Sequence, residues 1–177
     1  MADELVDIID EQGNVLRQAM KSEAHAHGWL HRTVIGYVRY GDDWALIRQS
    51  SHKQDAGQLV APVGGHVEAG ESVEDALLRE SEEEIGTRNI TYDHIGTVRF
   101  HRQVIGRDEN HMFYVYEIET DDEIILNHES EEILRFTRAE LKKALSTDPK
   151  NFGDAYYFIL EKFYPEYLPK QYVRRWD

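Results

Sequence analysis

Hydrophobic and polar residues alternate along several short stretches of the chain, a pattern typical of half-buried β-strands. The first two stretches, 5–9 and 15–19, flank a turn with Gly13-Asn14, so residues 4–20 are predicted to form a β-hairpin. A polar, histidine-rich connection, 21–32, follows the hairpin. Further strands are expected at 33–40, 44–49, 59–63, 89–95, 97–104, 112–118 and 133–136.

Helix signals occur in the middle of the chain and near its end. Ser72 is followed three residues later by Asp75, which indicates a helix start and a helix over 72–85. Thr137 and Glu140 form a capping-box pattern before the first of two C-terminal helices, expected within about 137–163. Strands on both sides of one central helix, with helices at the end, predict an α/β fold with a mixed sheet between helical layers.

The bulk properties are those of a soluble globular protein. A length of 177 residues suits one domain, so residues 1–177 are expected to fold together. No apolar run approaches the roughly 20 residues that span a bilayer, and the acidic N-terminus lacks the pattern of a signal peptide. The chain has no cysteine, which excludes disulfides and thiolate metal sites. A cytoplasmic location is the resulting expectation.

The formal net charge of −14 bears on the choice of partner. It argues against binding to a nucleic acid polymer or to an anionic membrane, since both need a basic face. A small phosphorylated substrate remains compatible with this charge, provided that divalent cations and a few local basic residues offset the negative field.

The strongest chemical signal is a cluster of glutamates within the predicted central helix. Glu80, Glu83 and Glu84 have the spacing i, i+3 and i+4, which places their side chains on one face of a helix. Like charges at this spacing repel each other, and hard carboxylate oxygens suit Mg²⁺ or Mn²⁺. A solvated acidic helix is the simpler interpretation. It accounts for the glutamates but not for the regular spacing of Gly65, Glu71, Arg79 and Gly86 around them.

Residues 65–87 carry the spacing G-x5-E-x7-R-E-x-x-E-E-x-G and resemble the signature of the Nudix hydrolase family. The resemblance implies an α/β/α sandwich and divalent metals bound by Glu80, Glu83 and Glu84, with help from the Gly65 carbonyl. It also implies that Glu71 and Arg79 form an ion pair holding the loop to the helix, although Arg79 could instead contact phosphate. One departure is Ser81, where the family prefers an aliphatic residue.

The general base is left open by the resemblance, because family members differ in its position. Glu80 is one candidate. The acidic loop 127–132 offers Glu129 as the first choice and Glu132 as the second. The alternative is that this loop is an exposed acidic turn.

A second, looser resemblance covers about residues 4–145 and points to the type I isopentenyl-diphosphate isomerases, a branch with the same fold. It rests on the opening hairpin, on 48–53 and on the run from Gly57 through Ser72. The resemblance implies a second metal site for Zn²⁺ or Mn²⁺, with the ligands His25, His31, His66, Glu109 and His111. The spacing from His25 to His31 is one residue shorter than in the isomerases, and His27 is a competitor for the position of His25. The alternative is that His66 contacts substrate and the N-terminal histidines are surface residues.

Isomerase chemistry itself is disfavoured by the residues present. Gly64 occupies the position of that branch's catalytic cysteine, and His111 stands where its partner glutamate would be. The predicted function is therefore a Mg²⁺- or Mn²⁺-dependent pyrophosphohydrolase acting on a small diphosphate compound, with nucleoside diphosphates or their derivatives as the leading class. Arg48, Lys53 and His66 are the expected substrate contacts. An isomerase-like enzyme and a non-catalytic nucleotide-binding module are the alternatives, and a homodimer is left open.

Overall fold

The computed structural model describes residues 3–51, 53, 55–104 and 106–170, and it begins with the predicted hairpin. Strands β1 (Leu5–Ile9) and β2 (Val15–Met20) pair antiparallel. Asp10 closes their turn, because its carboxylate accepts hydrogen bonds from the backbone N–H groups of Gln12 and Asn14, both at 2.9 Å. Asp10 thus supplies the local bonds that make this segment turn back on itself.

In the described residues, nine strands form one mixed sheet with β3 (His31–Tyr40) at its hub. Strand β3 pairs antiparallel with β4 and β6 and parallel with β8. The long strands β7 and β8 form a hairpin, and β5 and β9 pair antiparallel with β4. The bounds are β4 (Asp43–Gln49), β5 (Leu59–Val60), β6 (Val63–His66), β7 (Thr91–Val104), β8 (Arg107–Glu119) and β9 (Ser130–Phe136).

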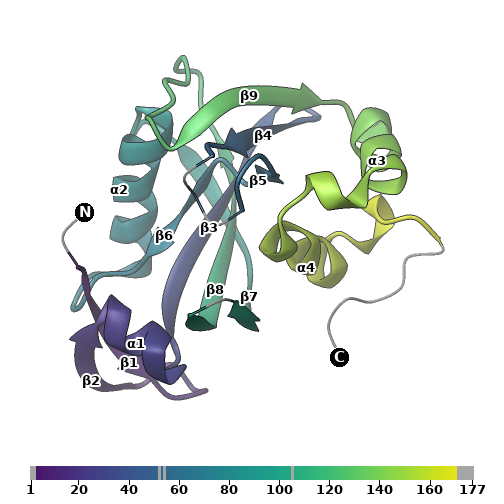
Figure 1. Cartoon of the computed structure of the whole chain (residues 1–177). Coiled ribbons are helices and arrows are strands. Elements are labelled where there is room, and N and C mark those ends of the chain that lie inside the picture. Colours follow the sequence, from purple (N-terminus) through teal and green to yellow (C-terminus); the bar gives the residue numbers. More distant parts are fainter. Residues whose placement is uncertain (1–2, 52, 54, 105, 171–177) are drawn as a thin grey trace.

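Helices cover both faces of this sheet, which confirms the predicted α/β architecture. Figure 1 shows α2 (Val73–Ile85) on one side and α3 (Arg138–Thr147) with α4 (Asp154–Phe163) on the other. Short 3₁₀ turns, Pro149–Asn151 and Pro165–Tyr167, flank α4. No helix among the described residues is both long and apolar enough to span a membrane.

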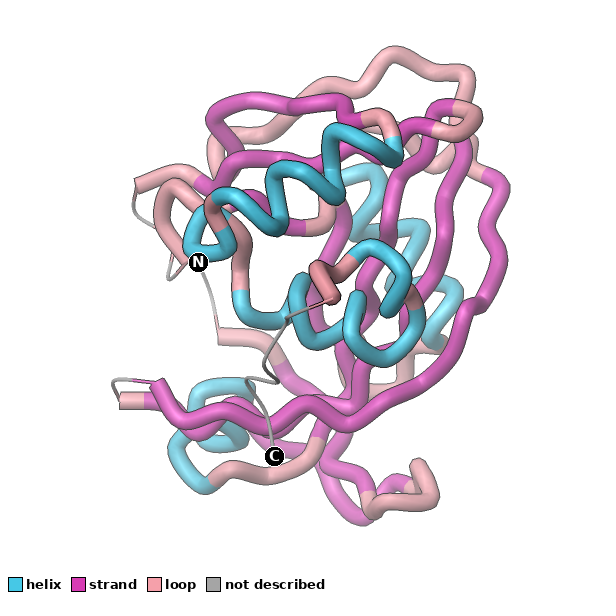
Figure 2. Tube along the Cα trace, turned by 90° about the vertical axis from the view of Figure 1, so that its right-hand side faces the viewer, coloured by secondary structure: helices cyan, strands magenta, loops and turns pink. Residues whose placement is uncertain are grey.

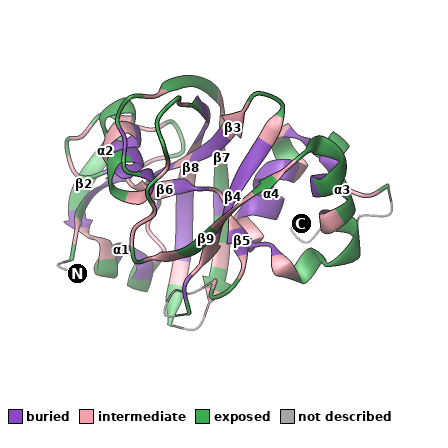
Figure 3. Cartoon of the chain, turned by 90° about the horizontal axis from the view of Figure 1, so that it is seen from above, coloured by how far each residue is buried: buried purple, intermediate pink, exposed green. Residues whose placement is uncertain are grey.

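The core is divided by the sheet into two layers, because successive residues of a strand face opposite sides. Val34 and Val38 of β3 pack with α2, whereas Tyr37 packs in an aromatic cluster beneath α4. Figure 3 shows the buried positions concentrated in the central strands and on the inner sides of α2 and α4. Three aromatic residues of α4 are buried in this core: Tyr156, Tyr157 and Phe158.

Several element boundaries differ from those expected. The polar connection contains a short helix, α1 (Lys21–His27), which ends at Gly28 with φ +64°. The run 59–63 is divided between β5 and β6 at Ala61-Pro62, where proline cannot donate a ladder hydrogen bond. The two strands expected within 89–104 are one strand, β7, with a register shift between His94 and Gly96. Figure 2 shows the end of the β7–β8 hairpin crossing beside α1.

Candidate functional site

Helix α2 carries the glutamate cluster, and both of its ends are fixed by specific hydrogen bonds. The Ser72 Oγ accepts a hydrogen bond from the Asp75 backbone N–H at 3.1 Å, which confirms the predicted helix start. At the other end, Gly86 has φ +79°, and the Asn127 side-chain amide donates to the Glu83 carbonyl at 3.0 Å. The carboxylates of the cluster therefore project from a helix whose ends are held in place.

Arg79 connects the signature loop to α2. Its guanidinium donates two parallel hydrogen bonds to Glu71, both at 3.0 Å, so the expected ion pair is present. The same group donates to the His66 carbonyl at 2.9 Å and to Glu80 Oε1 at 2.6 Å. Because these contacts occupy most of its donors, Arg79 is arranged to position the loop and Glu80 rather than to reach toward a phosphate.

Glu80 lies directly against Gly65. A Cβ atom at position 65 would be 2.0 Å from the Glu80 carboxyl carbon, so only glycine allows this approach. Burial raises the pKa of Glu80 to about 7, against the opposing effect of Arg79. The carboxyl group is thus held at the loop in a poorly solvated position, where a cation would favour its ionised form.

The other two glutamates of the cluster have different surroundings. Glu84 Oε2 accepts a hydrogen bond from the Gly64 backbone N–H at 2.6 Å, and burial followed by the charge of Glu80 raises its pKa well above the usual range. The Glu83 side chain is 58% exposed and lies 3.7 Å from the Arg79 guanidinium. The three carboxylates are therefore neighbours on one helix face but are not gathered into a compact ligand set. A shared cation would require Glu83 to turn inward.

The acidic loop before β9 reaches this helix, as its candidate role requires. Glu129 forms an ion pair with Lys53, and its carbonyl accepts a hydrogen bond from the Ser50 N–H at 3.0 Å. The charge of Glu129 also contributes to raising the pKa of Glu84, after burial and Glu80. Glu129 is consequently the loop carboxylate that acts on the cluster.

Glu132 and Arg48 form a separate pair on adjacent strands. Arg48 Nε donates to Glu132 at 2.7 Å, and Arg48 Nη1 donates to the Gly57 carbonyl and to Asn151. The two residues face each other in the register of β4 and β9. Arg48 is therefore held by three partners, whereas Lys53 pairs with Glu129 of the acidic loop.

The structure gathers four histidines predicted as metal ligands on the opposite face of the sheet from α2. Their potential ligand atoms all lie within 4.8 Å of one another: His25, His31, His66 and His111. Burial lowers the pKa of each imidazole, to about 4 for His31. The predicted fifth ligand, Glu109, lies outside this set, because its carboxylate accepts a 2.6 Å hydrogen bond from Arg102. The competitor His27 instead stacks on Trp29.

The sequence did not indicate two residues that hold the site in place. Asp7 of β1 is buried and accepts hydrogen bonds from the Gly70 N–H, at 3.0 Å, and from Arg32, at 2.8 Å, so the hairpin holds the signature loop. Asn127 caps α2 from a loop 44 residues away. No local signal identifies such contacts, because both depend on segments that meet only after folding.

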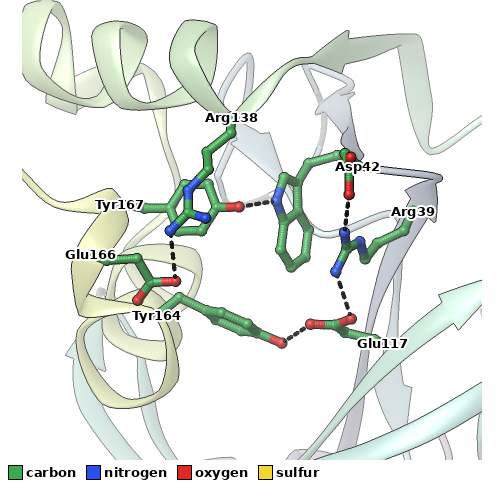
Figure 4. Close-up of a pocket in the computed structure, with 8 residues that line it drawn as sticks. Arg39, Asp42, Glu117, Arg138, Tyr164, Glu166 and Tyr167 are labelled. Carbon is green, nitrogen blue, oxygen red and sulfur yellow. Dashed lines mark hydrogen bonds and ion pairs between the residues drawn. The ribbon is translucent and has the colours of Figure 1, made fainter.

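A cavity of about 380 Å³ lies at the far end of β3 from His31 (Figure 4). Arg39 pairs there with Glu117 at 3.1 Å and with Asp42 at 3.7 Å, while Tyr164 donates to Glu117 at 2.7 Å. The charged groups that line it are thus largely paired with one another. Neither the α2 glutamates nor the histidines contribute to this cavity.

Comparison with known proteins identifies the family to which this chain belongs. The model of the NUDIX domain family matches residues 29–157, which is most of the chain, and the chain belongs to that family. An uncharacterized Nudix hydrolase from Streptomyces coelicolor is 41% identical over 95 residues, covering 50% of each chain. One from Yersinia pestis is 32% identical over 102 residues, covering 56% of each. The chain thus spans about half the length of the curated relatives it matches.

Solved structures share the fold at low sequence identity. The DR0079 protein from Deinococcus radiodurans superposes with a TM-score of 0.73 at 22% identity, covering 91% of this chain and 99% of that one. A MutT protein from Methanosarcina mazei gives a TM-score of 0.60 at 24% identity, covering 77% and 94%. These likenesses confirm the mixed α/β fold. The match to the family model establishes the NUDIX family. These relatives and structures do not establish the isomerase-like branch.

Proposed function

We propose that this chain is a divalent-metal-dependent hydrolase of phosphoanhydrides, with nucleoside diphosphates or their derivatives as the leading substrate class. The observation that carries the proposal is the arrangement of α2 against its loop. Glu80 is packed on Gly65, Glu84 is bonded to the Gly64 N–H, and Arg79 clamps Glu71 to the helix. The named relatives, all Nudix hydrolases, support the same reaction class.

The proposed cation ligands are Glu80, Glu83 and Glu84, with the Gly65 carbonyl as a further donor. These are hard oxygen donors, which suit Mg²⁺ or Mn²⁺ better than softer ions. A bound divalent cation would supply charge neutralisation on the phosphate oxygens and would acidify the attacking water. The close packing of Glu80 on Gly65 fixes one of these carboxylates at the loop.

Glu129 is the proposed general base. Its carboxylate lies near Glu84 and is paired with Lys53, so a phosphate that attracted Lys53 would release Glu129 to accept a proton. Glu132 is the weaker candidate, because Arg48 and the strand register hold it at the side of the sheet. Arg48 also donates to the Gly57 carbonyl, so it supports the loop between β4 and β5, and phosphate contact is left mainly to Lys53 of that loop.

The test is a phosphate-release screen over nucleoside diphosphates and isoprenoid diphosphates with Mg²⁺ or Mn²⁺. Glu83→Gln is expected to lower turnover by at least about 100-fold, since it removes a cation ligand. Glu82→Gln is the matched control, because Glu82 lies on the same helix but is exposed and paired with Arg88. Equal turnover by the two variants would contradict the metal assignment.

Two further outcomes separate the alternatives. Glu129→Gln is expected to lower kcat by about 100-fold or more with little change in KM, and Glu132→Gln much less. Phosphate release confined to isoprenoid diphosphates would favour an isoprenoid diphosphate hydrolase over a nucleotide hydrolase. Isomerisation itself releases no phosphate, and Gly64 and the absence of cysteine from the sequence argue against it. Binding of nucleotides without turnover of any diphosphate would favour a nucleotide-binding module.

A further inference from the structure

Four imidazole rings converge at the end of the sheet where β3 begins, and each comes from a different element. His25 lies on α1, His31 on β3, His66 on β6 and His111 on β8. His25 Nε2 is 3.2 Å from His111 Nε2, and the potential ligand atoms of all four lie within 4.8 Å of one another. Nitrogens that share a tetrahedral Zn²⁺ are about 3.3 Å apart, so the cluster needs only a small contraction to hold one ion.

His31 is also oriented as a metal ligand by its contact with the backbone. His31 Nδ1 lies 2.7 Å from the Trp29 carbonyl, which accepts its N–H and leaves the Nε2 lone pair directed into the cluster. The Nε2 atoms of His31 and His66 are buried and have no hydrogen-bond partner among the described residues. Such groups are costly to bury unless they are satisfied. The hydrogen bond between His25 and His111 does not satisfy these two nitrogens, whereas a bound metal ion would.

The donor set differs from that of the glutamate cluster. Glu109 is two residues from His111, but Arg102 holds its carboxylate, so the set consists of neutral nitrogen donors alone. Imidazole suits Zn²⁺, Ni²⁺ and Cu²⁺, whereas Mg²⁺ and Mn²⁺ prefer oxygen. Four protein ligands close a tetrahedral site and leave no position for water or substrate, which is the arrangement of structural zinc.

The cluster lies where α1 and the N-terminal hairpin meet the sheet. Strand β1 pairs with β3 at a single register position, Ile8 with His31, and the hairpin and α1 have only a small core of their own. His66 directly follows Gly65, and its carbonyl accepts a hydrogen bond from Arg79. An ion bound by the four rings would join α1 to three strands and steady the start of the signature loop.

We infer that His25, His31, His66 and His111 form a closed, structural site for one Zn²⁺ or similar late first-row ion, distinct from the α2 glutamates. This inference goes beyond the proposed hydrolase function. The site joins α1 to β3, β6 and β8. It takes no part in the chemistry, and its metal preference differs from that of the reaction.

The test uses the full chain without an affinity tag. The metal content after purification, or after incubation of chelator-treated protein with Zn²⁺ and gel filtration, is expected to be about one Zn²⁺ per chain. Zn²⁺ is expected to raise the Tm of the chelator-treated protein by about 5 °C or more, and Mg²⁺ is not. Co²⁺ in place of Zn²⁺ is expected to show the intense visible bands of a tetrahedral site.

A matched pair of variants locates the site. His25→Gln is expected to abolish stoichiometric Zn²⁺ binding and the Tm increase. His27→Gln is expected to retain both, because His27 lies on the same short helix but stacks on Trp29 outside the cluster. Absence of Zn²⁺ binding and of any Tm change in the wild-type chain would overturn the inference, and so would equal Zn²⁺ loss by both variants. These readouts need no turnover, so they stand apart from the test of the hydrolase function.

Discussion

Ser81 shows how a residue that departs from the family signature is accommodated. Its side chain is fully buried on the sheet side of α2, and its hydroxyl donates to the Leu77 carbonyl at 2.7 Å, four residues earlier. Because this carbonyl belongs to the helix ladder, the hydroxyl competes with a backbone bond and adds little stability. The departure from the signature thus concerns the packing of α2 on the sheet, and the Ser81 hydroxyl bonds to the helix backbone rather than to a glutamate of the cluster.

Ser81→Ala is accordingly expected to be neutral or to stabilise the protein by up to about 0.5 kcal/mol, because alanine has the higher helix propensity and removes a buried hydroxyl. Urea unfolding followed by circular dichroism measures the difference. A loss of more than about 1 kcal/mol would show that the hydroxyl is required in the core.

Gly65→Ala tests the close approach of Glu80 to the signature loop. The added methyl group would meet the Glu80 carboxylate at 2.0 Å and must displace it, so turnover is expected to fall about 100-fold in a protein that still folds. Gly64→Ala is the comparison, since its nearest neighbour would be Ile35 Cδ1 at 3.3 Å, and a much smaller loss is expected. Equal kcat/KM values for the two variants would contradict this role of Gly65.

At the scale of elements, the strands are defined by alternation and the helices by their caps. The capping residues Ser72 and Thr137 are found as predicted, because a cap is a bond between residues three apart in sequence. Helix α1 was not anticipated, because seven residues are too short for a stable isolated helix. Its position depends on β8, from which Asn110 donates to the Gly28 carbonyl at 2.8 Å.

The packing between β3 and β8 provides a prediction at this scale. A Cβ atom at Gly36 would lie 2.3 Å from Ile118 Cδ1, so Gly36→Ala is expected to cost about 1–3 kcal/mol of stability. Ile118→Val removes that methyl group, and the double variant is expected to recover part of the loss. A double-mutant cycle of unfolding free energies measures the coupling, and strict additivity would count against the steric explanation.

At the scale of the whole molecule, Arg102 joins segments that are far apart in sequence. Its guanidinium, 11% exposed, contacts Glu109 at 2.6 Å, Asp55 at 3.2 Å and Asp154 at 3.6 Å. These carboxylates belong to β8, to the loop before β5 and to α4. Arg102 therefore holds the Glu109 carboxylate outside the histidine cluster. Through Asp55 it also holds the loop that carries Lys53.

Arg102→Met is expected to destabilise the protein by about 3 kcal/mol, because it leaves the buried carboxylate of Glu109 and the partly buried carboxylate of Asp55 without their cation. Arg99→Met is the control from the same strand. Arg99 is 42% exposed and pairs with the 70% exposed Glu11, so its removal is expected to cost about 1 kcal/mol or less. Thermal unfolding compares the two, and similar costs would show that the Arg102 network is not a central connection.

The sequence by itself determined the signature loop and helix, the caps, the hairpin and the acidic character of the site. These features depend on residues close together in the chain, so spacing and periodicity are enough to identify them. Only the tertiary structure decided which predicted ligands meet. It brings four histidines together: His25, His31, His66 and His111. It also pairs Glu109 with Arg102 and places Glu129, rather than Glu132, beside the glutamates of α2. These outcomes depend on the pairing of distant strands and on competition between buried charges, which no local pattern encodes.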